Sequence, residues 1–183
     1  MSQELRILVA GIGGQGIHGF VRVLQQEMDE QGFELICARY KGGAQSLGSV
    51  HAECKVFLTK EQSNTQQSSQ LIPGTLDILL GLERWETLRF LPFCHAKTLI
   101  VCDAFTEFPP GTKRQIGLPT IDSYFTQLDN PLICKDFNAL AKEKGLSKSA
   151  VPVLLFNEAI DALGLKQLIE PLKTDTYELE RKL

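Results

Sequence analysis

Leu5–Ala10 (LRILVA), followed by Gly11–Gly16 (GIGGQG), is the stretch of sequence that decides the fold of this chain. The first six residues form a short apolar run rich in β-forming side chains, which predicts a buried strand ending at the glycines. Beyond them, apolar residues recur at helical spacing through Ile17–Met28, and Phe33–Ala38 (FELICA) is again typical of a strand. The order strand, glycine turn, helix and strand predicts a β-α-β unit with two parallel strands and a right-handed crossover.

The glycines of this turn stand at positions 11, 13 and 16, which is the G-x-G-x-x-G spacing of dinucleotide-binding turns. Such a turn lets the backbone approach a ligand, and the following helix N-terminus attracts an anion such as a phosphate. NAD also calls for a carboxylate at the end of the second strand, but Glu34 lies at its beginning and Arg39 near its end. Arg39 suits the extra phosphate of NADP, so an NADP-binding reductase stays open as an interpretation. A second open interpretation is that the turn only packs the helix against the strand.

Several further strands are predicted along the chain. Residues 48–57 alternate between apolar and polar side chains, which is typical of an antiparallel strand with one solvated face. Residues 76–82 (LDILLGL) and 97–102 (KTLIVC) are mostly apolar, which is typical of buried strands. We therefore expect a single α/β domain over residues 1–183, with three α/β/α layers around a predominantly parallel, mixed, Rossmann-like sheet. A polar, low-complexity stretch predicts a flexible loop near residues 59–75.

Composition and charge argue against several classes of protein. The chain has 19 Lys and Arg against 22 Asp and Glu, so no basic excess is present to neutralise a nucleic-acid backbone. No apolar run approaches the roughly 20 residues of a membrane span, and the first residues do not resemble a signal peptide. The five cysteines are widely spaced and include no C-x-x-C pair. They predict reduced, buried side chains in a cytoplasmic protein, with no iron–sulfur or zinc site on this chain.

A second glycine-containing stretch, Lys41–Phe57 (KGGAQSLGSVHAECKVF), is more specific than the first turn alone. Together with GIGGQG and the late segments Asn138–Gly145 (NALAKEKG) and Pro152–Leu163 (PVLLFNEAIDAL), it resembles the γ-type subunit or domain of the 2-oxoacid:ferredoxin oxidoreductases. Within that family, the resemblance is closest to the β subunit of the indolepyruvate type. The resemblance covers most of the chain.

The resemblance implies a subunit of a complex that oxidatively decarboxylates a 2-oxoacid, transfers the acyl group to coenzyme A and passes electrons to ferredoxin. It also implies that thiamine diphosphate and the [4Fe–4S] clusters belong to a larger partner subunit, which agrees with the lack of cluster cysteines here. This chain would then hold no catalytic residue and no metal. It would shape the active site or bind an anionic cofactor, with coenzyme A as the candidate, and contact ferredoxin only indirectly. A homodimer of the isolated chain is compatible with this interpretation.

The same resemblance assigns cofactor binding to the two glycine-containing stretches. The residues are Gly11, Gly13, Gly14, Gln15 and Gly16 in the first stretch and Gly42, Gln45, Ser46, Gly48 and Ser49 in the second. The second stretch departs from the family pattern, because Ser46, Leu47 and Lys41 stand where relatives carry arginine, glycine and histidine. Serine cannot replace the bidentate anion clamp of an arginine. The departures therefore leave a third interpretation open, a non-catalytic assembly protein of the same fold.

Other chemistry-bearing residues have ordinary explanations in the sequence. His51 and Glu53 alternate with apolar residues and are expected on a solvated or interface face of a strand. Asp103 directly follows a strand and is expected to serve a turn or a helix start, and His18 lies close to the glycine turn. An exposed apolar patch, formed either by residues 90–93 or by the C-terminal helix, is expected to contact the larger subunit.

Overall fold

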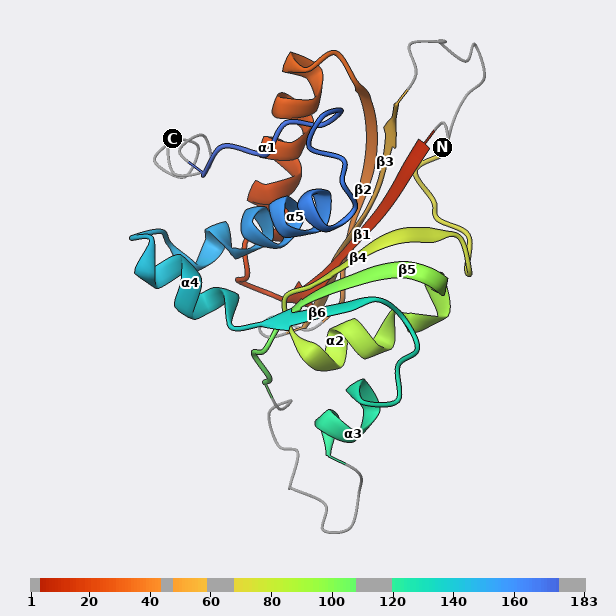
Figure 1. Ribbon diagram of the computed structural model, residues 1–183, viewed down its shortest axis with the longest axis vertical. Coiled ribbons are helices and arrows are strands. Elements are labelled where there is room, and N and C mark those ends of the chain that lie inside the picture. The colour runs from red at the N-terminus through yellow and green to blue at the C-terminus, as the bar shows by residue number, and fades with distance from the viewer. Residues whose placement is uncertain (1–3, 44–47, 59–67, 108–119, 175–183) are drawn as a thin grey trace.

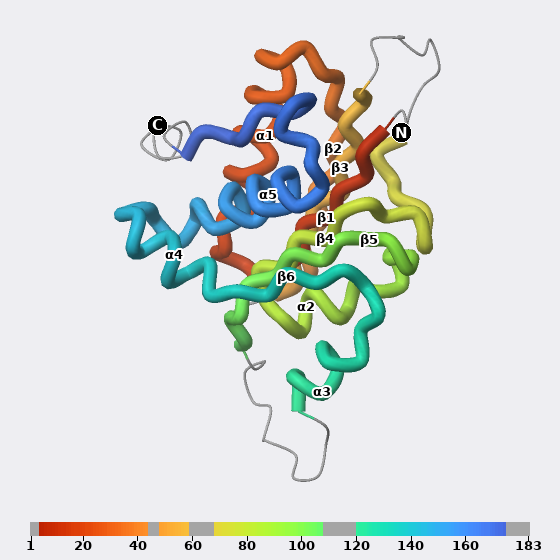
Figure 2. Tube along the Cα trace, in the orientation of Figure 1, coloured from red at the N-terminus to blue at the C-terminus, as the bar shows by residue number. Residues whose placement is uncertain are grey.

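The computed structural model describes residues 4–43, 48–58, 68–107 and 120–174, and these form one six-stranded sheet (Figure 1). The strands are β1 (Glu4–Ile12), β2 (Glu34–Lys41), β3 (Ser49–Phe57), β4 (Leu76–Gly81), β5 (Cys94–Asp103) and β6 (Leu132–Lys135). They lie side by side in the order β2-β3-β1-β4-β5-β6. Strands β1 and β4 therefore occupy the middle of the sheet, as the path of the chain in Figure 2 also shows.

The sheet is mixed and predominantly parallel, as predicted. Neighbours β1, β4, β5 and β6 run parallel, whereas β3 runs antiparallel to both β1 and β2. Strands β1 and β2 therefore point in the same direction, which agrees with the predicted β-α-β unit. They are not neighbours, however, because β3 lies between them. The alternating stretch that indicated an antiparallel strand is the one that occupies this position.

Helices cover both faces of the sheet and give the three predicted layers (Figure 1). Helices α1 (Ile17–Glu30), α4 (Phe137–Glu143) and α5 (Val151–Ala162) lie on one face, α2 (Arg84–Arg89) and α3 (Ile121–Phe125) lie on the other, and short 3-10 turns span Leu91–Phe93 and Lys148–Ala150. Ile7 and Val9 of β1 pack in the larger core with α1 and α5. Leu8 and Ala10 pack in the smaller core with Phe90, so alternate residues of β1 serve the two cores. No helix in the described ranges is both long and apolar enough to cross a membrane.

Residues 90–93 do not form the exposed patch that we predicted from the sequence. Phe90 is 8% exposed and belongs to the smaller core, and Leu91 and Phe93 are partly buried against that core. The rings of Phe90 and Phe93 contact each other, with centroids 6.0 Å apart. The prediction was wrong because the 3-10 turn after α2 folds these side chains back onto the sheet.

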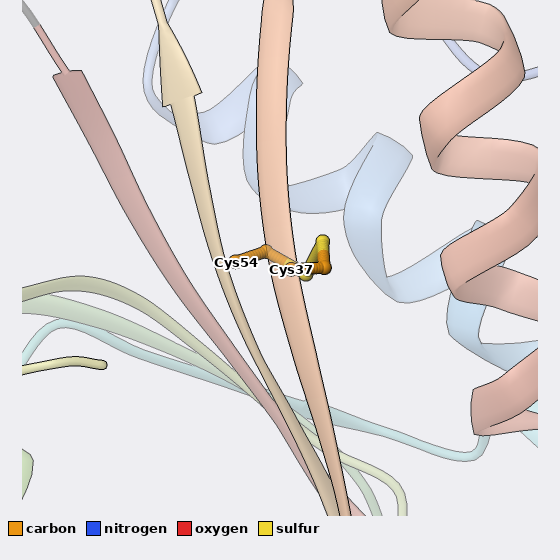
Figure 3. Close-up of a disulfide and its surroundings, with 2 residues drawn as sticks. All are labelled: Cys37 and Cys54. Carbon is orange, nitrogen blue, oxygen red and sulfur yellow. A yellow bond between two sulfur atoms is a disulfide. The ribbon is translucent and has the colours of Figure 1, made fainter. Parts of the chain in front are cut away.

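The cysteines are not all reduced and buried, contrary to the prediction. Cys37 on β2 and Cys54 on β3 form a disulfide (Figure 3). The two residues lie directly opposite each other in the β2–β3 register, with Cα atoms 4.2 Å apart. Antiparallel pairing thus joins two cysteines that are 17 positions apart in sequence. Cys94, Cys102 and Cys134 are free, and Cys134 is exposed.

The polar loop predicted near residues 59–75 lies only partly inside the described ranges, because residues 59–67 fall outside them. Its second part is attached to the sheet. The backbone N–H of Leu71 donates a hydrogen bond to Glu53 Oε2 over 2.7 Å, and Leu71 is buried in the smaller core. Lys55 Nζ donates to the backbone carbonyl of Ser68 over 2.7 Å. Residues 68–75 therefore hold a defined place against β3.

Candidate functional site

The carboxyl ends of β1, β4 and β5 meet at one edge of the sheet, and the chain leaves these strands in different directions. After β1 the chain enters α1 on one face of the sheet, and after β4 it enters α2 on the other face (Figure 1). Because β1 and β4 are parallel neighbours, a crevice opens between them where their connections diverge. Open α/β sheets bind ligands at this kind of position. The glycine turn of the sequence lies in this crevice.

The side chain of Gln15 holds the crevice open. The last direct hydrogen bond between the two strands runs from the Leu82 N–H to the Ala10 carbonyl, 2.8 Å. In a parallel ladder the next bond would run from the Ile12 N–H to the Leu82 carbonyl. Instead, the Ile12 N–H donates to Gln15 Oε1 (2.8 Å), and Gln15 Nε2 donates to the Leu82 carbonyl (2.8 Å). The carboxamide therefore sits between the two strands and satisfies both backbone groups.

Gly11 makes room for this insertion. It is the second-last residue of β1, inside the strand and not in the turn. A Cβ atom at this position would lie 2.5 Å from Gln15 Oε1 and 3.0 Å from Leu82 Cβ. These separations are shorter than van der Waals contact, so only glycine leaves space for the Gln15 carboxamide. Gly11 thus has a packing role that the spacing of the motif alone did not predict.

Gly14 and Gly16 have the conformations that the glycine pattern predicts. Their φ angles are +95° and +84°, in the left-handed region that favours glycine. Gly16 is the N-cap of α1, whose first helical bond runs from the Phe20 N–H to the Gly16 carbonyl, and no side chain caps this helix end among the described residues. A Cβ atom on Gly14 would have no neighbour within 4 Å. The turn therefore faces open space beside the positive end of a 14-residue helix.

A cavity of about 210 Å³ lies against this turn. It is lined by Ile12, Gly13, Gly14, Gln15, Leu82, Phe105, Glu107, Asn138, Lys148 and Val151. Lys148 supplies a cation and Glu107 a carboxylate, and both residues are exposed. Lys148 and Asn138 were not predicted as site residues, because nothing in their local pattern connects them with a turn more than 120 residues earlier. The fold brings them there by placing α4 and the 3-10 turn before α5 over the carboxyl end of β1.

Two buried carboxylates support the walls of the cavity. Asp103 accepts hydrogen bonds from the Phe105 N–H (2.7 Å) and the Asn138 N–H (2.9 Å). Glu83 is the N-cap of α2 and also accepts a hydrogen bond from the Glu107 N–H over 3.1 Å. Burial raises the pKa of both carboxyls above their ordinary values. Their hydrogen bonds fix the chain after β5, which agrees with the turn role expected for Asp103.

The second glycine-containing stretch lies beside the first. The Gly13 N–H donates to the Gly48 carbonyl over 2.9 Å, and the Gly42 N–H donates to the Ser49 carbonyl over 2.8 Å. Ser49 Oγ donates to Glu86 Oε2 on α2 over 2.6 Å. The structure therefore places Gly42, Gly48 and Ser49 beside the first turn, although, of these three residues and Gly13, only Gly13 lines the cavity. Gln45 and Ser46 lie outside the described residues.

The position of Arg39 does not support the NADP interpretation. Arg39 lies on β2, an edge strand, and β3 separates it from β1. Two strand spacings of about 4.8 Å put the backbones of β2 and β1 about 10 Å apart. In the dinucleotide-binding order the second strand is the direct neighbour of the first, so that its end reaches the ribose. Here β3 occupies that place.

His51 and Glu53 lie on a face that other parts of this chain cover, whereas their alternation predicted a solvated or interface face. Glu53 is 5% exposed, and the His51 ring stacks on Tyr40 with centroids 4.6 Å apart. His51 Nε2 lies 3.7 Å from Glu53 Oε1. Burial lowers the pKa of His51, although Glu53 and Glu86 oppose this effect. The smaller core and residues 68–75 supply the cover that the sequence pattern did not show.

With this geometry in place, comparison with known proteins decides the family. The pattern of the pyruvate ferredoxin/flavodoxin oxidoreductase family matches residues 6–175. The chain belongs to this family. Over 178 residues it is 25% identical to indolepyruvate oxidoreductase subunit IorB of Archaeoglobus fulgidus, covering 93% of this chain and 85% of that protein. The resemblance stated from GIGGQG and Lys41–Phe57 is thereby confirmed.

Solved structures show the same fold for this family. The γ subunit of a keto/oxoacid ferredoxin oxidoreductase from Geobacter sulfurreducens superposes with a TM-score of 0.60 at 15% identity, covering 99% of this chain and 92% of that chain. The pyruvate oxidoreductase subunit PORC of Thermotoga maritima gives 0.56 at 12% identity, covering 96% and 92%. A 2-oxoglutarate:ferredoxin oxidoreductase from Magnetococcus marinus matches all of this chain with 31% of its own length, at 15% identity and a TM-score of 0.55. These three likenesses show that the chain shares the fold of these proteins.

Proposed function

We propose that this chain is the small subunit of a 2-oxoacid:ferredoxin oxidoreductase complex and that the cavity at the carboxyl ends of β1 and β4 binds an anionic group of a ligand. The proposal is supported by the homology to IorB and to γ subunits. The Magnetococcus marinus relative is described with 2-oxoglutarate, coenzyme A and succinyl-CoA bound. All three ligands carry carboxylate or phosphate groups, so the expected ligand chemistry is anionic.

One observation carries the ligand-binding part of this proposal: the open face of Gly14 beside the cavity. A turn that served packing alone would have its glycines filled by neighbouring side chains, as Gly11 is. Gly14 instead has no neighbour within 4 Å of its Cβ position, next to the helix N-terminus and Lys148. Backbone N–H groups, the α1 dipole and the Lys148 ammonium together favour a phosphate or carboxylate at this point.

The size of the cavity limits what it holds. At about 210 Å³ it is smaller than the roughly 300–1,000 Å³ of sites that enclose a drug-sized ligand. A diphosphate-sized group fits, whereas the whole of coenzyme A does not. If coenzyme A is the ligand, we therefore propose that this chain holds its diphosphate, while surfaces outside the cavity contact the rest. Gly13, Gly14 and Lys148 are the residues that would orient such a group.

The reaction itself is proposed to take place on a partner subunit. Asp103 and Glu83 already accept backbone hydrogen bonds, so neither is placed to transfer a proton to a ligand. An iron–sulfur cluster needs four thiolates, and among the described residues no three His, Cys, Asp or Glu side chains converge as metal ligands. We propose that thiamine diphosphate and the [4Fe–4S] clusters belong to a larger subunit, that ferredoxin is reached through it, and that the complex is cytoplasmic.

A pair of isosteric variants tests the anion site. Gly14→Asp places a negative charge at the turn, and Gly14→Asn has the same shape and the same backbone strain without the charge. At roughly 5 Å and the high effective dielectric of an exposed position, the repulsion amounts to roughly 1–2 kcal/mol, so we expect binding to weaken about 5- to 30-fold. Calorimetric titration of the full-length chain with pyrophosphate and with coenzyme A measures this effect. Equal affinities for Gly14→Asp and Gly14→Asn would exclude an anion at the turn and favour the assembly role.

A second pair of variants tests the contribution of Lys148. Lys148→Gln removes the cation at the cavity, whereas Lys144→Gln removes one from the exposed end of α4, which is not part of the cavity wall. We expect only Lys148→Gln to weaken binding of pyrophosphate, about two- to fivefold. Affinity purification of the tagged chain from its native cell tests the subunit role separately. A large, brown, thiamine-containing partner is expected, and a colourless monomer or homodimer would contradict it.

A further inference from the structure

Two free thiols lie side by side near the carboxyl ends of β5 and β6. Cys102 on β5 and Cys134 on β6 are direct partners in the parallel β5–β6 register. Residues paired in this way point to the same face of the sheet. Cys102 is fully buried, and Cys134 is exposed. The pair therefore consists of one accessible and one protected sulfur on neighbouring strands.

A partly buried arginine side chain lies beside this pair. Arg84, the first residue of α2, interacts electrostatically with both cysteines. Its Nη2 forms an ion pair with Asp122 Oδ1 over 2.7 Å, and its guanidinium lies 4.5 Å from the centre of the Phe125 ring. Arg84 Nε is buried and has no hydrogen-bond partner among the described residues. A thiolate nearby would supply the hydrogen-bond acceptor that this N–H group lacks.

The charged groups around the pair favour a thiolate on Cys134. A hydrogen bond from Cys102 is the largest effect, and it lowers the pKa of Cys134; Arg84 acts in the same direction. Partial burial and the carboxylates Asp103 and Asp122 act in the opposite direction, and the pKa of Cys134 is lowered overall. The same hydrogen bond, together with burial, raises the pKa of Cys102. Cys134 is therefore the nucleophile of the pair, and Cys102 is a protonated donor to it.

We propose that Cys134 and Cys102 form a thiol–disulfide exchange site, in which the exposed Cys134 attacks a low-molecular-weight disulfide and the buried Cys102 resolves the product. Three observations support this: the in-register pairing of two free thiols, their difference in exposure, and the unpaired Arg84 Nε beside them. This site is separate from the anion cavity, which none of its residues line.

The reaction balances with one disulfide molecule as the oxidant. The Cys134 thiolate attacks one sulfur of the disulfide RSSR, the RS–SR bond breaks, and the first RS⁻ takes up the proton that Cys134 lost. In the resulting mixed disulfide the acceptor thiolate no longer exists, so the main cause of the raised Cys102 pKa disappears. Cys102 then loses its proton and attacks the Cys134 sulfur, and the second RS⁻ leaves with that proton. The dithiol is oxidised by two electrons, and RSSR is reduced to two RSH.

The strand geometry permits the final Cys102–Cys134 bond. Neighbouring strands lie about 4.7–4.9 Å apart, which is within the roughly 4.4–6.8 Å between Cα atoms in disulfides. The pairing of Cys102 with Cys134 in the register places their Cα atoms at about this separation. The two strands therefore need no large movement to form the bond.

The test uses the full-length chain and oxidised glutathione as the probe, followed by peptide mapping by mass spectrometry. The wild type is expected to form a Cys102–Cys134 cross-link and so to lose two hydrogens. The Cys102→Ser variant should stop at a glutathione adduct on Cys134. The Cys134→Ser variant should react at neither position. Cys94→Ser is the control and should behave as the wild type, because burial raises the pKa of Cys94 to about 11. Peptide mapping separates this pair from Cys37–Cys54. A Cys102→Ser protein without adduct on Cys134, or a wild type without the cross-link, would overturn the proposal.

Arg84 variants test the electrostatic part without changing either sulfur. Arg84→Lys keeps the charge and Arg84→Gln removes it. We expect alkylation of Cys134 by iodoacetamide at neutral pH to slow several-fold in Arg84→Gln, because each unit of increase in thiol pKa lowers the thiolate fraction about tenfold. The pH dependence of the rate should shift upward in Arg84→Gln and remain close to wild type in Arg84→Lys. Identical pH profiles in the three proteins would exclude Arg84 as the activating group.

Discussion

Replacing Gln15 by glutamate tests whether this side chain holds β1 and β4 apart. In the wild type, Gln15 Oε1 accepts from the Ile12 N–H, and Nε2 donates to the Leu82 carbonyl, both at 2.8 Å. A carboxylate has nearly the same shape and still accepts from Ile12. It cannot donate, however, so it turns a negative oxygen toward the Leu82 carbonyl oxygen. The substitution therefore changes one hydrogen bond and one charge at a fixed volume.

The size of the effect follows from these two changes. Loss of the donor removes one hydrogen bond, worth about 1 kcal/mol, and leaves the carbonyl of the buried Leu82 without its partner at a cost of about 1–3 kcal/mol. We therefore expect Gln15→Glu to lower the free energy of unfolding by about 2–4 kcal/mol at neutral pH. Gln25→Glu is the matched control, because Gln25 is exposed on α1 and its replacement by glutamate adds the same charge. Its effect should stay within about 0.5 kcal/mol.

Urea unfolding measured by tryptophan fluorescence gives these free energies. The chain has one tryptophan, Trp85 on α2, which is partly buried and reports on folding next to the crevice. The effect of Gln15→Glu should also depend on pH. The carbonyl oxygen and burial raise the folded-state pKa of the introduced carboxyl above its unfolded value of about 4.3. The stabilising contribution of the protonated form is therefore present at low pH and is lost as the pH rises through the folded-state pKa.

Lowering the pH from 7 toward 5 should thus reduce the difference between Gln15→Glu and the wild type, since a protonated carboxyl again donates to Leu82. A pH-independent difference would contradict the donor role of Gln15. A loss no larger than that of Gln25→Glu would refute the insertion of this side chain between the strands.

Three further substitutions test the packing, the buried charge and the disulfide. Gly81→Ala places a Cβ atom 2.9 Å from the Cβ of the buried Thr87, so we expect a loss of about 1–3 kcal/mol in urea unfolding. Burial raises the pKa of Asp103 above 3.8, so the protonated carboxyl stabilises the folded state at low pH. This contribution is lost as the pH rises from 3.8 through the folded-state pKa, and Asp103→Asn should flatten the pH dependence of the melting temperature in that window. Replacing Cys37 and Cys54 by serine opens a loop of 17 residues, and the unfolding free energy should fall by about 3 kcal/mol relative to the oxidised wild type. A reducing agent should produce the same loss in the wild type and none in the double variant.

Local patterns predicted the first part of the fold because each element there is specified by its own residues. The apolar run before Gly11, the helical spacing after Gly16 and the alternation in residues 48–57 each depend on contacts with one layer of neighbours. Strand order is different, because it depends on which strand edge each chain segment reaches after its turn. The alternation of apolar and polar side chains indicated that β3 is antiparallel. The same alternation carries no information on the position of β3 between β1 and β2.

The missed features of the site have the same physical origin. Cys37 and Cys54 meet because of the β2–β3 register, in which Glu34 lies opposite Phe57, and no local sequence pattern specifies that register. The role of Gln15 requires knowledge of the direction of its carboxamide, and Lys148 reaches the cavity only through the packing of α5. Such features depend on contacts between residues far apart in the sequence, so periodicity and spacing could not predict them.

Under the proposed function, the glycine turn combines packing with ligand access, two roles that the sequence alone left as alternatives. Gly11 and Gln15 serve packing, since the first leaves the space that the carboxamide of the second fills. Gly14 faces the cavity, which exists because that carboxamide keeps the ends of β1 and β4 from pairing directly. Packing and an open cavity are thus successive consequences of one arrangement. The motif GIGGQG is more specific than a general glycine fingerprint because its glutamine performs a step that glycine spacing alone does not provide.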